Sequence, residues 1–327
     1  MKEGPMKLGF TVPQFGPDAG PDTLLEVARL AEELGSDSLW VIERLLYPTN
    51  PKAPYPATAD GSLPLAYRRS LDPLAILAYL AAATSRVRIG AFINLPFHNP
   101  VLLARELGTI DVLSDGRLDI GLGVGWSLDE LEAVGVPMGE RGWHAEEALR
   151  VLEAIWRDNP VKFEGRYFQV PESYFDLKPV QKPRPPIYMP AYTPVAMSRV
   201  GRLADGWIPT GLPIWAMEQM FAGIKQGAAE AGRDPSSLKL IVIGHAEFHP
   251  EPLGDERPIF AGSAEQIEAD IVATRQLGAD ELIFNALFSP DIGSTDDLLS
   301  RVEQLWTMAR RSERAFSVTA NRSAAHA

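Results

Sequence analysis

Short apolar segments alternate with longer amphipathic segments along most of this chain. Residues 87–95 form an apolar run of strand length that is too continuous for a surface strand. Residues 101–113 then carry apolar side chains at helical spacing, with Asn99 as a cap before them and Gly116 for a left-handed turn after them. A second apolar run follows at 117–122. The stretch therefore predicts a parallel strand–helix–strand unit.

The same alternation occurs eight times. Predicted strands begin near residues 6, 38, 87, 117, 187, 206, 238 and 281, and a predicted helix follows each of them. Eight regular βα units in the α/β class favour a closed (β/α)8 TIM barrel over an open sheet. We expect one barrel domain over residues 1–311 and a disordered tail over residues 312–327.

Three irregular segments interrupt the regular pattern. Residues 45–71 are rich in proline, tyrosine and glycine, and a segment of this length inside a compact domain is usually a functional loop or lid. Residues 159–186 form a proline- and aromatic-rich insertion with an expected hairpin near Gly165. Residues 244–260 are the third irregular segment. All three are expected to shape the substrate site.

Charge and composition narrow the classes of function. The formal charge of −12 argues against a nucleic-acid-binding surface, which needs an excess of basic residues. The absence of cysteine excludes disulfides and thiolate chemistry. No apolar run reaches the ~18 residues of a membrane span, and no signal-peptide core is present, so we expect a cytoplasmic protein without membrane contact.

Function in parallel α/β folds lies beyond the carboxyl ends of the strands. The second predicted strand ends at Glu43 and Arg44, a carboxylate and a guanidinium that either form a structural ion pair or serve a ligand. The fourth ends in the glycine turn 121–125, which either allows close packing or approaches a cofactor. Its spacing does not match a dinucleotide-binding fingerprint.

Two further patterns are weaker. Ser127 and Glu130 have the spacing of a capping box at the start of a helix. His245 and His249 resemble a zinc motif only superficially, because the glutamate between them is misplaced and Pro250 argues against a helix. We therefore expect no metal site.

Several stretches together resemble the bacterial luciferase-like superfamily of flavin and deazaflavin oxidoreductases, and most closely its actinobacterial branch that uses coenzyme F-420. The resemblance runs from about residue 8 to residue 310. It is carried by SLWVIERL (38–45), YPATADGSLPL (55–65), residues 90–137, PVQKPRPPIYMPA (179–191) and RLADGW (202–207).

The resemblance implies a cofactor site at the barrel mouth. A bulge with a non-proline cis peptide at Ala91–Phe92 would support the cofactor ring, the glycine turn would approach its ribityl chain, and a helix N-terminus would bind its phosphate. The implied cofactor-binding residues are Ala91, Phe92, Ile93, Asn94, Gly123, Val124, Gly125, Ala191, Tyr192 and Thr193. FMN-using relatives carry an arginine where this chain has Val124, which favours F-420 over FMN.

The chain also departs from its relatives at two catalytic positions. Arg44 stands where relatives usually have histidine, and Trp126 stands where F-420-dependent sugar-phosphate dehydrogenases have a glutamate proton donor. Because arginine stays protonated, any proton transfer falls to Glu43, Glu130, the solvent or a tyrosine of 45–71. Gln14, Trp126 and His98 are expected in the substrate pocket, and glucose-6-phosphate is not the expected substrate.

The implied activity is hydride transfer between coenzyme F-420 and a small organic substrate. A two-component monooxygenase that uses reduced FMN and O2 is the first alternative, and it would need a flavin reductase as a partner. A non-catalytic ligand-binding barrel is the second. Relatives form dimers, so a homodimer is expected by resemblance only.

Overall fold

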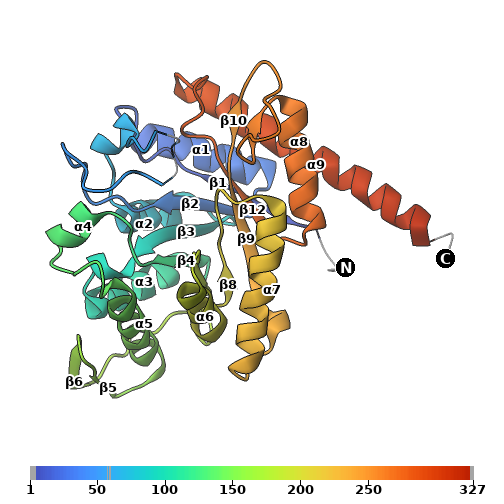
Figure 1. Ribbon diagram of the computed structural model, residues 1–327. Coiled ribbons are helices and arrows are strands. Elements are labelled where there is room, and N and C mark those ends of the chain that lie inside the picture. The colour runs from blue at the N-terminus through green and yellow to red at the C-terminus, as the bar shows by residue number, and fades with distance from the viewer. Residues whose placement is uncertain (1–4, 57, 59, 325–327) are drawn as a thin grey trace.

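The structure is a computed structural model that describes residues 5–56, 58 and 60–324, with side chains as far as residue 313. Eight parallel strands close into a barrel in the order β1-β12-β9-β8-β7-β4-β3-β2, which confirms the predicted (β/α)8 TIM barrel (Figure 1). The barrel strands are β1 (Lys7–Thr11), β2 (Ser38–Ile42), β3 (Arg88–Asn94), β4 (Leu118–Gly123), β7 (Ile187–Met189), β8 (Gly206–Trp207), β9 (Lys239–His245) and β12 (Glu281–Asn285).

Helices connect the strands and cover the outside of the barrel (Figure 1). Most of the apolar positions on the side that faces the barrel are buried, as the helical spacing predicts. They are α1 (Pro21–Leu34), α2 (Pro73–Ala83), α3 (Pro100–Leu113), α4 (Leu128–Ala133), α5 (Arg141–Arg157), α6 (Pro194–Leu203), α7 (Ile214–Glu230), α8 (Ala264–Gln276) and α9 (Thr295–Ala324), with short 3-10 helices η1 (Leu65–Arg68), η2 (Leu95–Phe97) and η3 (Pro235–Ser237).

The structure contains the cap and the left-handed turn that the sequence predicts at the two ends of α3. The Asn99 side chain accepts hydrogen bonds from the N–H groups of Val101 and Leu102, at 3.0 and 3.3 Å. Pro100 occupies the first turn, where its missing N–H costs nothing. Gly116 adopts a φ of 75°, the left-handed conformation expected after the helix.

The expected bulge and cis peptide at Ala91–Phe92 are wrong. β3 pairs in continuous register with β2 and with β4, residue for residue, through Phe92. Among the described residues, cis peptides occur only at Asn159-Pro160 and Lys182-Pro183. A β3 that is paired on both sides gives the chain no local reason for the ~3–4 kcal/mol cost of a non-proline cis bond.

Two glycines let aromatic rings pack inside the barrel. A Cβ at Gly90 would lie 2.6 Å from the Trp40 ring, and a Cβ at Gly121 would lie 2.6 Å from the Phe92 ring. The Trp40 and Phe92 rings stack at 4.7 Å with an interplanar angle of 24°. Close packing therefore accounts for Gly121 without any cofactor.

Charged groups fill the amino-terminal end of the barrel and find partners there. Arg88 donates to both carboxylate oxygens of Asp119, at 2.6 and 2.8 Å. The buried Glu281 accepts a hydrogen bond from the Ser38 hydroxyl, which in turn accepts one from the Trp40 indole at 2.8 Å. Burial raises the pKa of Glu281 to about 7, and the nearby charge of Asp119 adds to this effect.

The irregular segments differ in how much structure they contain. Within 45–71, apart from residues 57 and 59, which are not described, only the single turn η1 is helical. The 159–186 insertion contains the expected hairpin, formed by β5 (Val161–Glu164) and β6 (Gln169–Ser173). In 244–260 the first residues extend β9, and β10 (Glu247–Phe248) pairs with β11 (Ala261–Gly262).

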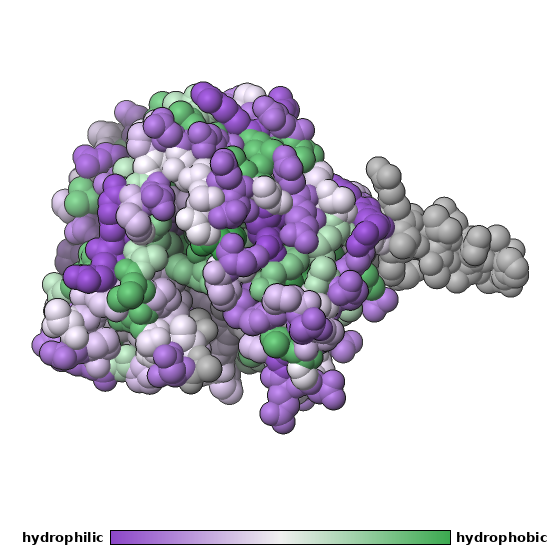
Figure 2. Space-filling model, turned by 90° about the horizontal axis from the view of Figure 1, so that it is seen from above, coloured by the Kyte–Doolittle hydropathy of each residue, from purple (hydrophilic) through white to green (hydrophobic). Residues whose placement is uncertain are grey.

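The last helix is longer than expected. A disordered tail was expected from residue 312, but α9 continues to Ala324, so residues 312–324 are helical in the structure (Figure 1). Residues 325–327 of that expected tail lie outside the described part. None of the described helices is long and apolar enough to cross a membrane. On the face in Figure 2, hydrophobic residues gather in small groups between hydrophilic ones.

Candidate active site

Glu43 lies immediately beyond β2, at the carboxyl end of the barrel strands. Its Oε2 accepts a hydrogen bond from the Asn94 backbone N–H at 2.6 Å, and its Oε1 contacts His98 Nε2 at 2.6 Å. The Glu43 side chain is 7% exposed. The carboxylate is therefore held by groups from the β3 end and the loop after it, and not by its neighbour Arg44.

His98 is the partner of Glu43 and remains in partial contact with solvent. Burial lowers the pKa of His98, but the hydrogen bond to Glu43 and its negative charge outweigh burial, so the net shift is upward. The acidic residues Glu106 and Asp72 add to this rise. The protonated form of His98 is consequently favoured beside the carboxylate.

Arg44 turns away from Glu43 and contacts a different carboxylate. Its Nη2 lies 3.1 Å from Glu130 Oε2, and the two side chains are 5% and 1% exposed. The guanidinium also lies over the rings of Tyr67 and Trp126, with centroid distances of 5.3 and 5.0 Å. A buried cation is thus stabilised by one carboxylate and two aromatic faces.

Glu130 fixes the start of the segment that follows Arg44. Its Oε1 accepts hydrogen bonds from the N–H groups of Leu45 and Leu46, at 2.8 and 3.3 Å. Ser127 caps the Glu130 N–H, but Glu130 does not return a bond to Ser127, so only half of the expected capping box forms. Burial raises the pKa of Glu130 against the opposing effect of Arg44.

These residues surround a small cavity. Its volume is about 150 Å³, and its wall combines residues from the ends of β2, β3, β4 and β7 with two tyrosines of 45–71. The lining residues are Ile42, Glu43, Arg44, Tyr55, Tyr67, Phe92, Ile93, Asn94, Gly123, Trp126 and Pro190.

Seven of the residues selected from the sequence line this cavity: Glu43, Arg44, Phe92, Ile93, Asn94, Gly123 and Trp126. Gln14 does not, because its amide group bonds to the backbone N–H and C=O of Ile42, each at 2.5 Å. His98 and Glu130 lie behind Glu43 and Arg44. The sequence interpretation missed Ile42 and Pro190, although each directly adjoins a predicted site residue.

The other expected cofactor residues lie close to the cavity but not on its wall. Ala91 is buried in the core, and Val124 packs partly against it. Gly125 has a φ of 74°, which requires glycine at the turn after β4.

We call residues 45–71 the lid, because its tyrosines cover the cavity. The hydroxyl groups of Tyr55 and Tyr67 lie 2.8 Å apart, and the Tyr55 ring lies 5.3 Å from that of Trp126. Tyr67 packs edge-on against Phe15 at 4.7 Å. Burial raises the pKa of both tyrosines, so both are weaker acids here than an exposed tyrosine.

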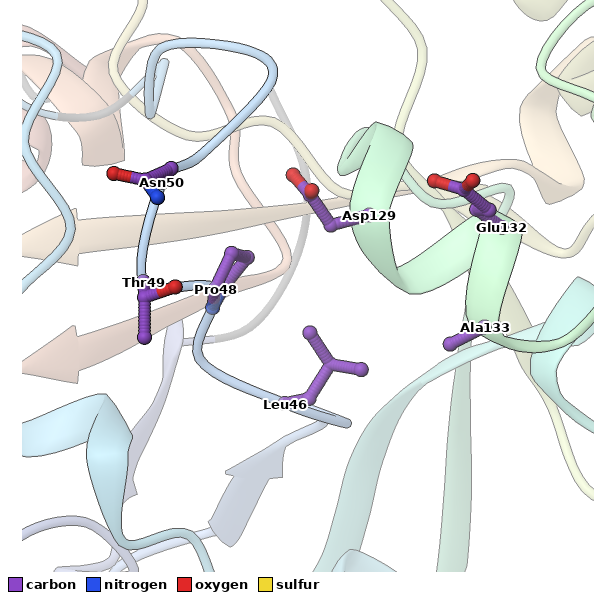
Figure 3. A pocket seen from close by; sticks show the side chains of 7 residues that line it. All are labelled: Leu46, Pro48, Thr49, Asn50, Asp129, Glu132 and Ala133. Carbon is purple, nitrogen blue, oxygen red and sulfur yellow. The ribbon is translucent and has the colours of Figure 1, made fainter.

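A wider groove of about 500 Å³ separates the outer part of the lid from α4. Figure 3 shows Leu46, Pro48, Thr49 and Asn50 on the lid side, facing Asp129, Glu132 and Ala133 of α4. Lys52 crosses between the two sides, since its backbone N–H donates to Asp129 at 3.0 Å and its ammonium group pairs with Glu132. The lid is therefore held to α4 by polar contacts at the protein surface.

A helix N-terminus lies beside the cavity. Pro190 lines the cavity wall, and the chain continues through Ala191 and Tyr192 to Thr193, whose hydroxyl caps α6 by accepting from Ala196 N–H at 3.3 Å. The first-turn amides of a helix favour anions. The helix itself begins at Pro194, directly after this cap.

The residues that would hold a deazaflavin according to the sequence resemblance lie in and beside this cavity. The ends of β3 and β4 form the cavity floor, where a Cβ at Gly123 would lie 2.8 Å from Asn94 Oδ1, and the α6 N-terminus lies next to Pro190. The volume of about 150 Å³ is below the ~300–1,000 Å³ of typical small-molecule sites. A tricyclic ring would therefore need more room than the cavity has in this structure.

Ionisable and aromatic side chains gather at the carboxyl ends of four strands of a closed (β/α)8 barrel, which is the place where TIM-barrel enzymes carry their active sites. The family model of luciferase-like monooxygenases matches residues 6–252. The chain therefore belongs to the luciferase-like monooxygenase family, as the sequence resemblance indicated.

Comparisons with individual proteins agree with this assignment. An uncharacterized protein of Mycobacterium tuberculosis is 34% identical over 280 residues, which cover 85% of this chain and 90% of the relative. An F-420-dependent glucose-6-phosphate dehydrogenase of Kineococcus radiotolerans is 30% identical over 258 residues, covering 76% of this chain and 70% of the relative. A solved F-420-dependent secondary alcohol dehydrogenase has the same fold, with a TM-score of 0.73 at 20% identity, over 92% of this chain and 99% of that one.

Proposed function

We propose that this protein is an oxidoreductase that binds coenzyme F-420 at the carboxyl end of the barrel and exchanges a hydride between it and a small organic substrate. The observation that carries the proposal is the cavity itself. It lies over the ends of β3 and β4, and its wall reaches Pro190, next to the N-terminus of α6. Family membership and the F-420-dependent relatives support the choice of cofactor.

In this proposal the cofactor supplies the hydride chemistry, and the chain supplies position, shielding and proton handling. Phe92, Ile93, Asn94 and Gly123 would hold the ring, and the segment from Ala191 to Thr193 would hold the phosphate-bearing tail. The lid would exclude water once it closes over a substrate.

Proton transfer in this site falls to Glu43. It lines the cavity, and its contact with the partly exposed His98 links the cavity to solvent. Arg44 stays protonated and Trp126 carries no acid, so neither takes this role. Because Trp126 replaces the glutamate of the sugar-phosphate dehydrogenases, the substrate is not expected to be glucose-6-phosphate.

The alternative is a two-component monooxygenase that uses reduced FMN and O2, to which the description of the matching family points. It would use the same cavity. The absence of an arginine at Val124 favours F-420.

Paired binding titrations test the proposal. Oxidised F-420 and FMN are titrated into the purified protein, and cofactor fluorescence is followed. Gly123→Val places a side chain against Asn94 at the cavity floor and should abolish F-420 binding. Gly139→Val is the matched control, because Gly139 is exposed and a Cβ there has no neighbour within 4 Å.

Each outcome of the titrations supports one of the three functional hypotheses. Tighter binding of F-420 than of FMN, lost in Gly123→Val and kept in Gly139→Val, supports the hydride-transfer proposal. Preferential binding of reduced FMN would instead select the monooxygenase. Binding of neither cofactor would leave a ligand-binding barrel that has lost its cofactor.

A further inference from the structure

The strongest unexplained feature of the cavity is the donor edge of Arg44. Arg44 is 9% exposed and lines the cavity. Neither Nε nor Nη2 has a hydrogen-bond partner in the described part of the chain, although Nη2 lies 3.1 Å from Glu130 Oε2 without hydrogen-bond alignment. A buried donor without a partner is costly, and here two adjacent donors are left in this state.

These two N–H groups form one edge of the guanidinium. That edge presents parallel donors at the spacing of the two oxygens of a carboxylate, which is the geometry of bidentate recognition. The rings of Tyr67 and Trp126 lie against the guanidinium, with centroid distances of 5.3 and 5.0 Å. The edge is the part of Arg44 whose hydrogen-bonding capacity is unused, and a ligand would reach it by taking the place of Glu130 beside Nη2.

The charges around the cavity are balanced before a ligand binds. Arg44 faces Glu130, and the other carboxylate on the cavity wall, Glu43, faces His98. These two pairs balance when His98 is protonated. Arg44 is the single cation among the described residues that line the cavity, so a ligand carboxylate would compete with Glu130 for it, and a monoanion would add less uncompensated charge than a phosphate with two charges.

Most of the rest of the wall is aromatic or aliphatic, and Glu43 and Asn94 are the other residues with polar side chains on it apart from the two tyrosines. Tyr55, Tyr67, Phe92 and Trp126 surround the space beside Arg44. The flat aromatic surfaces of these side chains suit a ligand ring that stacks on them or packs edge-on against them.

We propose that the substrate is a ring-bearing carboxylate whose carboxylate group binds the Nε and Nη2 edge of Arg44 while its ring packs between Trp126 and the lid tyrosines. This inference deepens the proposed function and rests on it for the claim that the ligand is a substrate. It makes Arg44 the residue that determines specificity and Glu130 the group that holds the empty guanidinium in place.

Calorimetric binding of two small probes tests the inference. Benzoate carries the ring and the carboxylate, and benzamide has the same shape without the charge. The unmodified protein should bind benzoate about 10-fold or more tightly than benzamide, since hydrogen bonds to charged groups contribute more than neutral ones. Arg44→Lys keeps the charge but loses the paired donors, and should lose most of this preference.

Two further variants separate recognition from damage to the fold. Arg44→Gln combined with Glu130→Gln leaves no unpaired buried charge, and should bind benzoate and benzamide equally. Glu130→Gln alone removes the competing carboxylate from Arg44 and should bind benzoate more tightly than the unmodified protein. Arg157→Gln, at an arginine whose side chain is 72% exposed, is the control and should change nothing.

Equal affinity of the unmodified protein for the two probes, absence of benzoate binding, or full benzoate preference in the double variant would each overturn the inference. The F-420 titration is run separately on the same proteins. Benzoate preference without F-420 binding would refute the proposed function while leaving the Arg44 site intact. F-420 binding without benzoate preference would refute only the inference.

Discussion

The buried charged side chains at the two ends of the barrel differ in how completely they are hydrogen-bonded. At the amino-terminal end, Arg88 donates to both oxygens of Asp119, and Glu281 bonds to Ser38. At the carboxyl-terminal end, Arg44 has one loosely aligned carboxylate and two donors without partners.

This contrast distinguishes charged groups that stabilise the fold from charged groups that can still bind a ligand. A group that is fully paired has nothing left for binding, and its removal is felt in stability. A group that is buried with spare donors carries a cost in the empty protein, which a ligand with the matching acceptors removes. The positions agree with TIM barrels in general, where the amino-terminal face contributes stability and the carboxyl-terminal face contributes chemistry.

The largest stability effect is expected at the amino-terminal end. Arg88→Met leaves the Asp119 carboxylate, which is 5% exposed, without its cation. We expect a loss of about 4 kcal/mol in the free energy of unfolding, measured by urea denaturation.

Arg88→Met combined with Asp119→Leu is the matched control for this change. It removes both charges and should recover most of the loss. A loss below ~1 kcal/mol in the single variant would mean that the pair behaves like an exposed surface ion pair, and the contrast between the ends would fail.

The second effect concerns Glu281 and the pH dependence of stability. Its pKa is about 7 in the folded protein against an ordinary value of 4.5. Between these values the unfolded chain releases its proton while the folded chain keeps it, so stability falls as pH rises and levels off above pH 7. We expect the unmodified protein to lose about 3 kcal/mol more than Glu281→Gln across this range. Urea unfolding of both proteins at several pH values measures the difference, and parallel profiles would contradict it.

The smallest effect is expected at the carboxyl-terminal end, for His98→Gln. Glu43 raises the pKa of His98, so this pair stabilises the folded protein fully below the ordinary value of 6.5 and loses its effect as pH rises through the folded pKa. We expect His98→Gln to cost on the order of 1 kcal/mol in unfolding free energy below pH 6.5, with the cost shrinking at alkaline pH.

His144→Gln is the control for this pH trend. Burial lowers the pKa of His144, so its effect on stability has the opposite pH dependence. The His98 pair would be excluded as a stabilising charge pair if the two variants followed the same trend.

Local sequence signals determined most of the fold. Strands β2, β7 and β12 begin at the residues where the sequence predicted them, and the caps at Asn99 and Gly116 are in place. These features depend on residues within a few positions of one another, so the sequence pattern alone is sufficient to predict them. Seven of the expected site residues also reach the cavity, because parallel strands place their carboxyl ends together.

Only the tertiary structure determines which charged side chains pair with one another at the site. Glu43 and Arg44 are neighbours in sequence, yet one contacts His98, 55 positions away, and the other contacts Glu130, 86 positions away by residue number. The continuous pairing of β3, the hydrogen bonds of Gln14 to Ile42 and the packing of the lid tyrosines at the cavity are likewise set by contacts between distant segments. A linear pattern carries no direct record of such contacts, because they depend on packing geometry that forms only when the barrel closes.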